Sequence, residues 1–357
     1  MNKVKILVIL TGGTICSFGD SENLNRALDM GKAKRILIEN FRNSTSHYRN
    51  EEFEVVQFLD VLSENMTIDK WNMLTNGLRT IDFSMYKGVI VAHGTDTLAY
   101  TSSLLALILS SVRIPVIMVS SNRPLNSEGA NGNENFSCAV QLICEGLVKG
   151  VYVVYRNMNG CMYIHKGGHL NQCGDYSEDF YSHDGIMVYG DNEKGNNTFT
   201  IISINEWADK HWNEGQGICL TDVGELKNDV LYIRPYVGLR YDTMDIDNSV
   251  RAVVHQLYHS QTACSDTGED NSINSICSFA YRCKEKNIPV FVTPCYEQHS
   301  LYTSSETMKE SGVIPVYGMT NEMAYVKALV AGALRINDAG DMCRFMGRDI
   351  CGEFMDV

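Results

Sequence analysis

The sequence predicts an α/β fold with a larger N-terminal domain, in which helices flank a parallel sheet, and a smaller C-terminal α/β domain. The chain has 357 residues, and domains usually contain about 100–200 residues, so its length indicates two domains. Short apolar runs alternate with segments of helical periodicity, which is the pattern of repeated strand–helix–strand units. Glycine is plentiful (29 residues) and proline scarce (6 residues), as is typical of a compact enzyme rather than a disordered chain.

Five apolar runs are the expected strands of the larger domain. They cover Val4–Leu10, Phe53–Leu59, Gly88–Ala92, Pro115–Ser120 and Val151–Tyr155. Helices are expected between them, the first with Thr67 as its N-cap and two more over Asp96–Ser111 and Phe136–Leu147. Each expected strand ends just before a polar turn and a helix start. In open α/β sheets ligands bind at that carboxyl edge.

The pattern changes after about residue 190. We expect a catalytic domain over residues 1–205, a connection over 206–226 and a second domain over 227–357. The second domain has expected strands and helices at Val230–Pro235, Val250–Tyr258, Ser272–Lys286, Pro289–Pro294 and Asn321–Leu334. The buried face predicted for its first helix consists of Ile273, Ile276, Cys277, Ala280 and Cys283.

Composition argues against several classes of protein. The chain has 30 Lys+Arg against 43 Asp+Glu, and its net charge of −13 should repel nucleic acid. No stretch approaches the roughly 18 apolar residues of a membrane helix. The twelve cysteines include no Cys-x-x-Cys pair, and residues 1–10 lack the long apolar run of a signal peptide. We therefore expect a cytoplasmic protein with free thiols. His165 and His169 lack an accompanying carboxylate or cysteine cluster, so we expect no metal.

Three motifs follow expected strands and place polar groups at one sheet edge. In Thr11–Ile15 paired glycines permit a tight turn that would expose the Thr14 hydroxyl. In His93–Thr97 a hydroxyl and a carboxylate meet a helix N-terminus. Ser63–Met66 is a short polar turn. Helix capping or a local turn explains each motif taken alone. Capping does not explain two threonine-bearing glycine turns at equivalent strand ends.

Together these motifs resemble those of the L-asparaginase family of amidohydrolases, and the resemblance covers nearly the whole chain. Thr11–Ile15 resembles one family signature, His93–Thr97 matches the other in full, and Ser63–Met66 resembles the substrate-carboxylate loop. Gly312–Ile314 and Arg348–Glu353 look most like the bacterial cytoplasmic type I branch. The resemblance implies the asparaginase fold, hydrolysis of L-asparagine to L-aspartate and ammonia without a cofactor, and a homodimer or homotetramer.

The resemblance also implies catalytic roles. Thr14 would be the nucleophile, and Thr95, Asp96 and Lys166 would form a second cluster in which the lysine helps to activate a hydroxyl or a water. A threonine hydroxyl is a poor nucleophile at neutral pH and needs such help. A lysine acts as a base only when it is partly neutral, which a nearby Asp96 would oppose. Lys166 is therefore either a base or an electrostatic organiser.

Substrate binding is implied for six residues. Ser63 would hold the α-carboxylate, Asp96 the α-ammonium and the Ser121 backbone the amide, while N–H groups would stabilise the oxyanion. The full set is Gly13, Ser63, Glu64, Thr95, Asp96 and Ser121, with Gly13 and Thr95 as the oxyanion donors. Glu64 leaves the preference between asparagine and glutamine open.

One departure from the family pattern bears on activity. The family carries a lid tyrosine after the first motif, whereas residues 16–40 contain none. Tyr48 reaching in, reduced activity, or a substitute hydroxyl or amide are the alternatives, the substitutes being Ser17, Ser21, Asn23 and Asn25. Two other functions stay open for the chain. It could be a related amidase or glutaminase, such as the tRNA-dependent amidotransferase type, or a catalytically impaired amino-acid-binding homologue.

Overall fold

The computed structural model describes residues 4–20, 23–28, 30–146, 149–190, 199–200, 217–268, 272–296 and 302–356. The chain divides into two compact units. Unit 1 contains Met1–Thr221 and Ile350–Gly352, and unit 2 contains Asp222–Asp349 and Glu353–Val357. Most of the expected connection, residues 206–216, lies outside the described residues.

Unit 1 is built on an eight-stranded sheet in the order β10-β9-β8-β7-β6-β5-β1-β4. Its strands are β1 (Lys5–Gly12), β4 (Phe53–Val61), β5 (Tyr86–Ala92), β6 (Pro115–Val119), β7 (Gly150–Arg156), β8 (Met162–Lys166), β9 (Ile186–Gly190) and β10 (Phe199–Thr200). The five strands from β4 to β7 in this order are mutually parallel, whereas β8, β9 and β10 pair antiparallel. A separate hairpin pairs β2 (Ser17–Asp20) with β3 (Asn23–Leu28).

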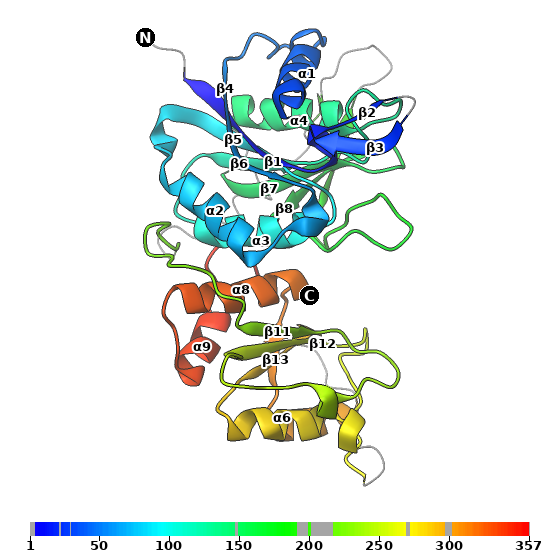
Figure 1. Cartoon of the computed structure of the whole chain (residues 1–357), viewed down its shortest axis with the longest axis vertical. Coiled ribbons are helices and arrows are strands. Elements are labelled where there is room, and N and C mark those ends of the chain that lie inside the picture. Colours follow the sequence, from blue (N-terminus) through cyan, green and yellow to red (C-terminus); the bar gives the residue numbers. More distant parts are fainter. Residues whose placement is uncertain are drawn as a thin grey trace. The chain divides into compact units, whose positions relative to one another are not determined.

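Helices cover both faces of this sheet. They are α1 (Met30–Arg42), α2 (Ile68–Arg79), α3 (Leu98–Ile108) and α4 (Gly132–Glu145). Figure 1 shows α1 and α4 on one face and α2 and α3 on the other. Because both faces are covered, the central strands are apolar throughout rather than alternating, and every residue of β1 after Lys5 is buried. The predicted N-cap of α2 is confirmed, since the Thr67 hydroxyl accepts from the Lys70 N–H.

The strand order places a switch point beside β1. The chain leaves β1 for β4 on one side and then returns to β5 on the other side. Connections that leave a parallel sheet in opposite directions open a crevice at the carboxyl ends of the strands. The segments that follow β4, β1 and β5 therefore meet at one edge. These are the segments that carry the three motifs.

Unit 2 has a smaller, fully parallel sheet in the order β11-β12-β13-β14. Its strands are β11 (Val230–Ile233), β12 (Ala252–Gln256), β13 (Val290–Cys295) and β14 (Ile314–Tyr317), and its helices are α6 (Ile276–Glu285), α7 (Thr303–Glu310), α8 (Asn321–Ala333) and α9 (Ala339–Met346). Inside it the fully buried Lys327 ammonium lies 2.5 Å from the Glu353 carboxylate. The predicted α/β class is confirmed.

The expected helix over Ser272–Lys286 starts later than predicted. Ser272–Asn274 forms a separate 3-10 turn, and α6 begins at Ile276 because the Ser275 hydroxyl caps it by accepting from the Cys277 N–H. Ile273 therefore falls outside the helix and is 42% exposed, which corrects its assignment to the buried face. The other four residues predicted for that face are buried.

The helices and the cysteines of the described residues bear on membrane insertion and on disulfide bonding. In the described ranges no helix is long and apolar enough to span a bilayer. All twelve cysteines lie in these ranges, and none forms a disulfide bond. Burial raises the pKa of Cys16, two residues after Thr14, to about 12, so this thiol stays protonated at neutral pH.

Candidate active site

Two glycine backbones in contact join the first two motifs. Gly13 follows β1 with φ +78°, and a Cβ added to it would lie 2.2 Å from the Gly94 Cα. Leu10 of β1 pairs with Ala92 of β5, so the two turns leave neighbouring strands at the same level. Thr14 and Thr95 are the residues that follow these glycines. The fold thus brings the two predicted threonines to adjacent turns, where both are half-buried.

The third motif packs against the second. Ser63 begins a 3-10 turn after β4, and its side chain lies so close to Gly94 that a Cβ there would be 2.4 Å from the Ser63 Oγ. The Ser63 hydroxyl donates to the Asp96 carboxylate (3.0 Å) and accepts from the Asp96 N–H (3.2 Å). The Thr97 hydroxyl donates to the Ser63 carbonyl (3.0 Å). Ser63 and Asp96, predicted to bind the two α-groups of an amino acid, are therefore hydrogen-bonded neighbours.

Helix capping does not account for these polar side chains. Thr97 is the N-cap of α3, yet its side chain makes no capping hydrogen bond. The Thr97 hydroxyl and the Asp96 carboxylate instead contact Ser63, 33 to 34 residues away in sequence. Asp96 is exposed. A carboxylate held by one hydroxyl and open to solvent beside a helix N-terminus can bind a ligand ammonium group.

Gly13, predicted as an oxyanion donor, already has a backbone hydrogen-bond partner. The N–H of Gly13 donates to the Val61 carbonyl at 3.0 Å, as part of the packing between β1 and β4. This N–H is thus engaged within the fold. Gly13 therefore shapes the site through its missing side chain. Glu64, also predicted to bind substrate, is exposed on the turn that Ser63 begins.

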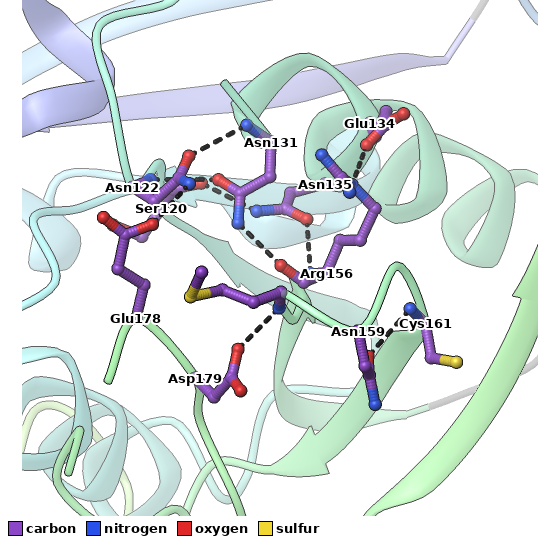
Figure 2. Close-up of polar contacts among 11 residues, drawn as sticks. Ser120, Asn122, Asn131, Glu134, Asn135, Arg156, Asn159, Cys161, Glu178 and Asp179 are labelled. Carbon is purple, nitrogen blue, oxygen red and sulfur yellow. Dashed lines mark hydrogen bonds and ion pairs between the residues drawn. The ribbon is translucent and has the colours of Figure 1, made fainter. Parts of the chain in front are cut away.

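An asparagine network holds the loop that carries Ser121. The Asn122 N–H donates to the Asn131 side-chain carbonyl (2.9 Å), and the Asn131 N–H donates to that of Asn122 (3.1 Å). Figure 2 shows these two side chains pointing toward one another at the start of α4. The Asn122 amide also donates to the Glu178 carboxylate (2.9 Å). Ser121 itself is buried, and its hydroxyl donates to the Arg123 carbonyl.

Asn135 and Arg156 extend this network into the sheet. The Asn135 amide donates to the Ser120 carbonyl (2.9 Å), and its oxygen accepts from the Arg156 N–H (2.8 Å), so one side chain ties the end of β6 to the end of β7. An ion pair between the Arg156 and Glu134 side chains lies beside it (Figure 2). Buried polar groups that are mutually satisfied in this way fix a single conformation. The loop after β6 is thus held in place by the network.

Lys166 is the last residue of β8, and its ammonium is paired with Asp184. It lies opposite Tyr152 of β7, and the next residue, Gly167, accepts a hydrogen bond from the Ser102 hydroxyl of α3. The Lys166 Nζ lies 2.9 Å from the Asp184 Oδ2. Lys166 thus lies beside the helix that begins after Asp96, and it is buried with 7% of its surface exposed.

The segment between β8 and β9 contributes residues that the sequence reasoning missed. The Gln172 amide donates to the Asp96 carbonyl. Burial, followed by the carboxylates of Asp179, Asp96 and Glu178, raises the pKa of the neighbouring Cys173 thiol, which makes it a poor nucleophile. No sequence pattern marks Gln172, because its partner Asp96 lies 76 residues away in the chain.

Tyr48 does not replace the missing lid tyrosine. Its hydroxyl donates to Glu145, the last residue of α4, at 3.3 Å. α4 starts after β6 at the carboxyl edge and runs back along the sheet, so its end lies at the opposite edge from the three motifs. The side chains of Ser17, Ser21, Asn23 and Asn25 lie outside what the structure describes.

No metal site emerges from the described residues, which contain no group of three or more His, Cys, Asp or Glu side chains that could hold an ion. His165 and His169 are both buried but have different partners. The His165 Nδ1 contacts the Ser182 hydroxyl (2.8 Å), and the His169 Nδ1 contacts Asp184 (2.9 Å). Burial lowers the pKa of His165 to about 4, so this ring is neutral at pH 7.

Comparison with known proteins assigns the N-terminal half to a family and the whole chain to a fold. Residues 5–177 match the family model "Asparaginase, N-terminal". Curated relatives include one subunit of the glutamyl-tRNA(Gln) amidotransferase of Methanobrevibacter smithii, 25% identical over 99% of this chain and 77% of the relative. The corresponding subunit from Pyrococcus horikoshii is 25% identical over 98% of this chain and 76% of the relative.

Solved structures agree on the fold. The thermostable L-asparaginase from Thermococcus kodakarensis superposes with a TM-score of 0.74 at 21% identity and covers 99% of this chain and 100% of its own. L-asparaginase I from Vibrio cholerae also gives a TM-score of 0.74, at 18% identity with 99% of each chain covered. At these identities the likeness establishes the fold.

The glycine contact predicts a large effect of Gly13→Ala on stability. Its new methyl group would lie 2.2 Å from the Gly94 Cα, in addition to the strain of a positive φ. Gly146→Ala is the matched control, because Gly146 has φ +64° but open space around it, and strain alone costs about 1 kcal/mol. In urea unfolding we expect Gly13→Ala to lower the free energy of unfolding at least twice as much as Gly146→Ala. Equal losses would refute a close contact.

His93 predicts a pH dependence of stability. Burial lowers its pKa to about 4, although the Gly94 carbonyl and Asp96 partly oppose this. Between pH 6.5 and pH 4 the unfolded chain therefore binds a proton that the folded chain does not, so stability is lost as the pH falls through this window. We expect His93→Asn to lose about 2 kcal/mol less stability than the wild type between pH 7 and pH 4.5. Urea unfolding at both pH values measures this.

The control for the His93 experiment is His47→Asn, which removes an exposed histidine. This variant should follow the wild-type curve. Parallel curves for His93→Asn and the wild type would show that His93 titrates normally in the folded protein.

Proposed function

Because residues 5–177 place the chain in the asparaginase family of amidohydrolases, we propose that this enzyme hydrolyses the side-chain amide of L-asparagine to L-aspartate and ammonia. The observation that carries the proposal is the contact between Gly13 and Gly94. This contact sets two hydroxyl groups, Thr14 and Thr95, beside a hydrogen-bonded serine–aspartate pair. A nucleophile next to groups that can bind both α-substituents of an amino acid suits an amidase that acts on a free amino acid.

Substrate binding would use the Ser63–Asp96 pair. The Asp96 carboxylate would accept hydrogen bonds from the substrate α-ammonium, and Ser63 would hold the α-carboxylate near the start of α3, where backbone N–H groups favour an anion. The side-chain amide of the substrate would then extend toward Thr14. The Ser121 backbone, fixed by the asparagine network, would meet that amide.

The reaction would proceed in two steps through a covalent intermediate. The Thr14 oxygen attacks the amide carbon, the proton of its hydroxyl is passed on to the amide nitrogen, and the oxyanion that forms accepts from the Thr95 N–H. Collapse of this intermediate breaks the C–N bond, releases ammonia after protonation of the nitrogen, and leaves an ester on Thr14. A water molecule, activated in the cluster of Thr95, Asp96 and Lys166, then hydrolyses the ester to give aspartate and free Thr14.

A second candidate function has support from the two curated relatives named above, each of which is one subunit of a glutamyl-tRNA(Gln) amidotransferase. The chain could release ammonia from another amide, such as that of glutamine, as one component of a larger enzyme. The net charge of −13 does not favour binding to tRNA. We propose that the chain instead forms a homodimer or homotetramer in the cytoplasm. Light scattering on the purified protein, alone and with candidate partners, distinguishes the two assemblies.

The proposed mechanism predicts the effect of removing either hydroxyl. Thr14→Ala and Thr95→Ala should each lower kcat/KM for ammonia release from asparagine by about a thousandfold or more, because each removes a group that acts in bond formation or proton transfer. Thr303→Ala, at an exposed threonine of unit 2, is the control and should match the wild type. A coupled ammonia assay measures the rates. Full activity of either variant would remove that threonine from the mechanism.

The geometry also predicts a preference between amides. The Ser63–Asp96 pair and Thr14 stand on turns locked by glycine packing, so the distance between them suits one chain length. Glutamine is longer by one methylene group, and such a difference changes kcat/KM by about 10–200-fold. We expect asparagine to be preferred in a panel of L-asparagine, D-asparagine and L-glutamine. A higher kcat/KM for glutamine would favour the second candidate function.

A further inference from the structure

The Lys166 ammonium belongs to a buried cluster of three ionisable groups. Its Nζ lies 2.9 Å from the Asp184 Oδ2, and the Asp184 Oδ1 lies 2.9 Å from the His169 Nδ1. Asp184 stands two residues before β9, so it reaches Lys166 from the next segment of the chain. Lys166 and His169 are 7% and 1% exposed. One carboxylate thus bridges two basic side chains, each through its own oxygen.

Hydrogen-bond chemistry assigns the protons in this cluster. The His169 Nε2 lies 2.7 Å from the Gly352 carbonyl, which can only accept, so Nε2 carries a hydrogen. Burial acts to raise the pKa of Asp184, but hydrogen bonds and charge from His169 and Lys166 outweigh it and hold that pKa well below its ordinary value. The carboxylate is therefore ionised, and it contacts both the Lys166 Nζ and the His169 Nδ1. In this arrangement the Lys166 ammonium donates to one oxygen of the anion, and the His169 ring contacts the other oxygen.

The neighbours of Lys166 on β7, β8 and α3 include several neutral groups. His165 is neutral and bonded to Ser182, Tyr152 lies opposite Lys166 on β7, and α3 presents the Ser102 hydroxyl to the Gly167 carbonyl. The Asp96 carboxylate is bonded to Ser63. An opposite charge at hydrogen-bond distance favours the charged form of an amine.

We propose that Asp184 is a positioning residue that, together with His169, holds Lys166 in place as an ammonium ion, so that Lys166 serves the reaction as a fixed positive charge and not as the base. An ammonium ion has no lone pair with which to accept a proton. It can stabilise negative charge that develops on a hydroxyl or a water nearby. Lys166 enters this inference as a catalytic group only through the proposed function.

Asp184→Asn tests the inference, because the two roles of Lys166 predict opposite signs. Removing the carboxylate charge makes loss of the lysine proton easier. If Lys166 acts as a fixed charge, kcat at neutral pH falls about tenfold or more, and the alkaline limb of the pH profile moves to lower pH. KM for asparagine changes little, because Ser63 and Asp96 bind the α-groups. If Lys166 were the base, kcat at neutral pH would instead rise.

Three further variants show whether the effect of Asp184→Asn comes from losing the charge beside Lys166. Asp184→Glu keeps the charge and should recover part of the activity and the wild-type alkaline limb. Asp175→Asn, at an exposed aspartate of the same segment, should leave the profile unchanged. In Lys166→Met the alkaline limb should disappear, and adding Asp184→Asn should cause no further loss. Circular dichroism and urea unfolding of Asp184→Asn show whether the fold is retained.

The outcomes separate this inference from the proposed function. If Thr14→Ala is inactive while Asp184→Asn has the kcat and pH profile of the wild type, the role of Asp184 is wrong and the threonine mechanism stands. A rise in kcat for Asp184→Asn would also overturn the role given to Lys166. If Thr14→Ala retains full activity, the proposed function itself fails.

Discussion

The contact between the backbones of Gly13 and Gly94 is the constraint on which the candidate site depends. A side chain at either position would collide with the other turn or with Ser63. Without the contact between Gly13 and Gly94, the turns after β1 and β5 would separate, and Thr14 and Thr95 would move apart with them. Ser63 fills the remaining space and bonds to Asp96, so one packing arrangement brings together the proposed nucleophile, the second threonine and the proposed binding carboxylate. Glycine is required at both positions for proximity, and at Gly13 also for its positive φ.

Two carboxylates of unit 1, those of Asp96 and Asp184, lie in surroundings with different chemistry. The Asp96 carboxylate is exposed and held by a neutral hydroxyl, so it remains open to a cationic ligand group. The Asp184 carboxylate is partly buried and lies 2.9 Å from both the Lys166 ammonium and the His169 ring. The exposed Asp96 carboxylate suits recognition of a ligand, and the paired Asp184 carboxylate suits the positioning of another side chain. The asparagine network fixes the loop after β6 through side-chain amides, one of which also donates to the Glu178 carboxylate.

Prediction from the sequence succeeded where a feature depends on neighbours in the chain. Thr67 was identified as an N-cap from its place before an amphipathic run, and the structure confirms it. Prediction was wrong for Ile273, because the hydroxyl of Ser275 starts the helix one turn late and no periodicity reveals which serine caps. The N–H of Gly13, predicted as an oxyanion donor, is bonded to the carbonyl of Val61 on a neighbouring strand, and its oxyanion role stays a prediction.

The sequence by itself determined the α/β class, the strand ends that carry the motifs, and the residue types available for chemistry. These follow from local patterns of apolar residues, glycine turns and helix caps. The tertiary structure alone decided which groups meet. Asp184 pairs with Lys166 across 18 residues, Asn122 with Glu178 across 56, and Gly13 touches Gly94. The physical reason is that strand order, which no local pattern encodes, sets these distances, and distance decides whether a carboxylate binds a substrate or holds a lysine.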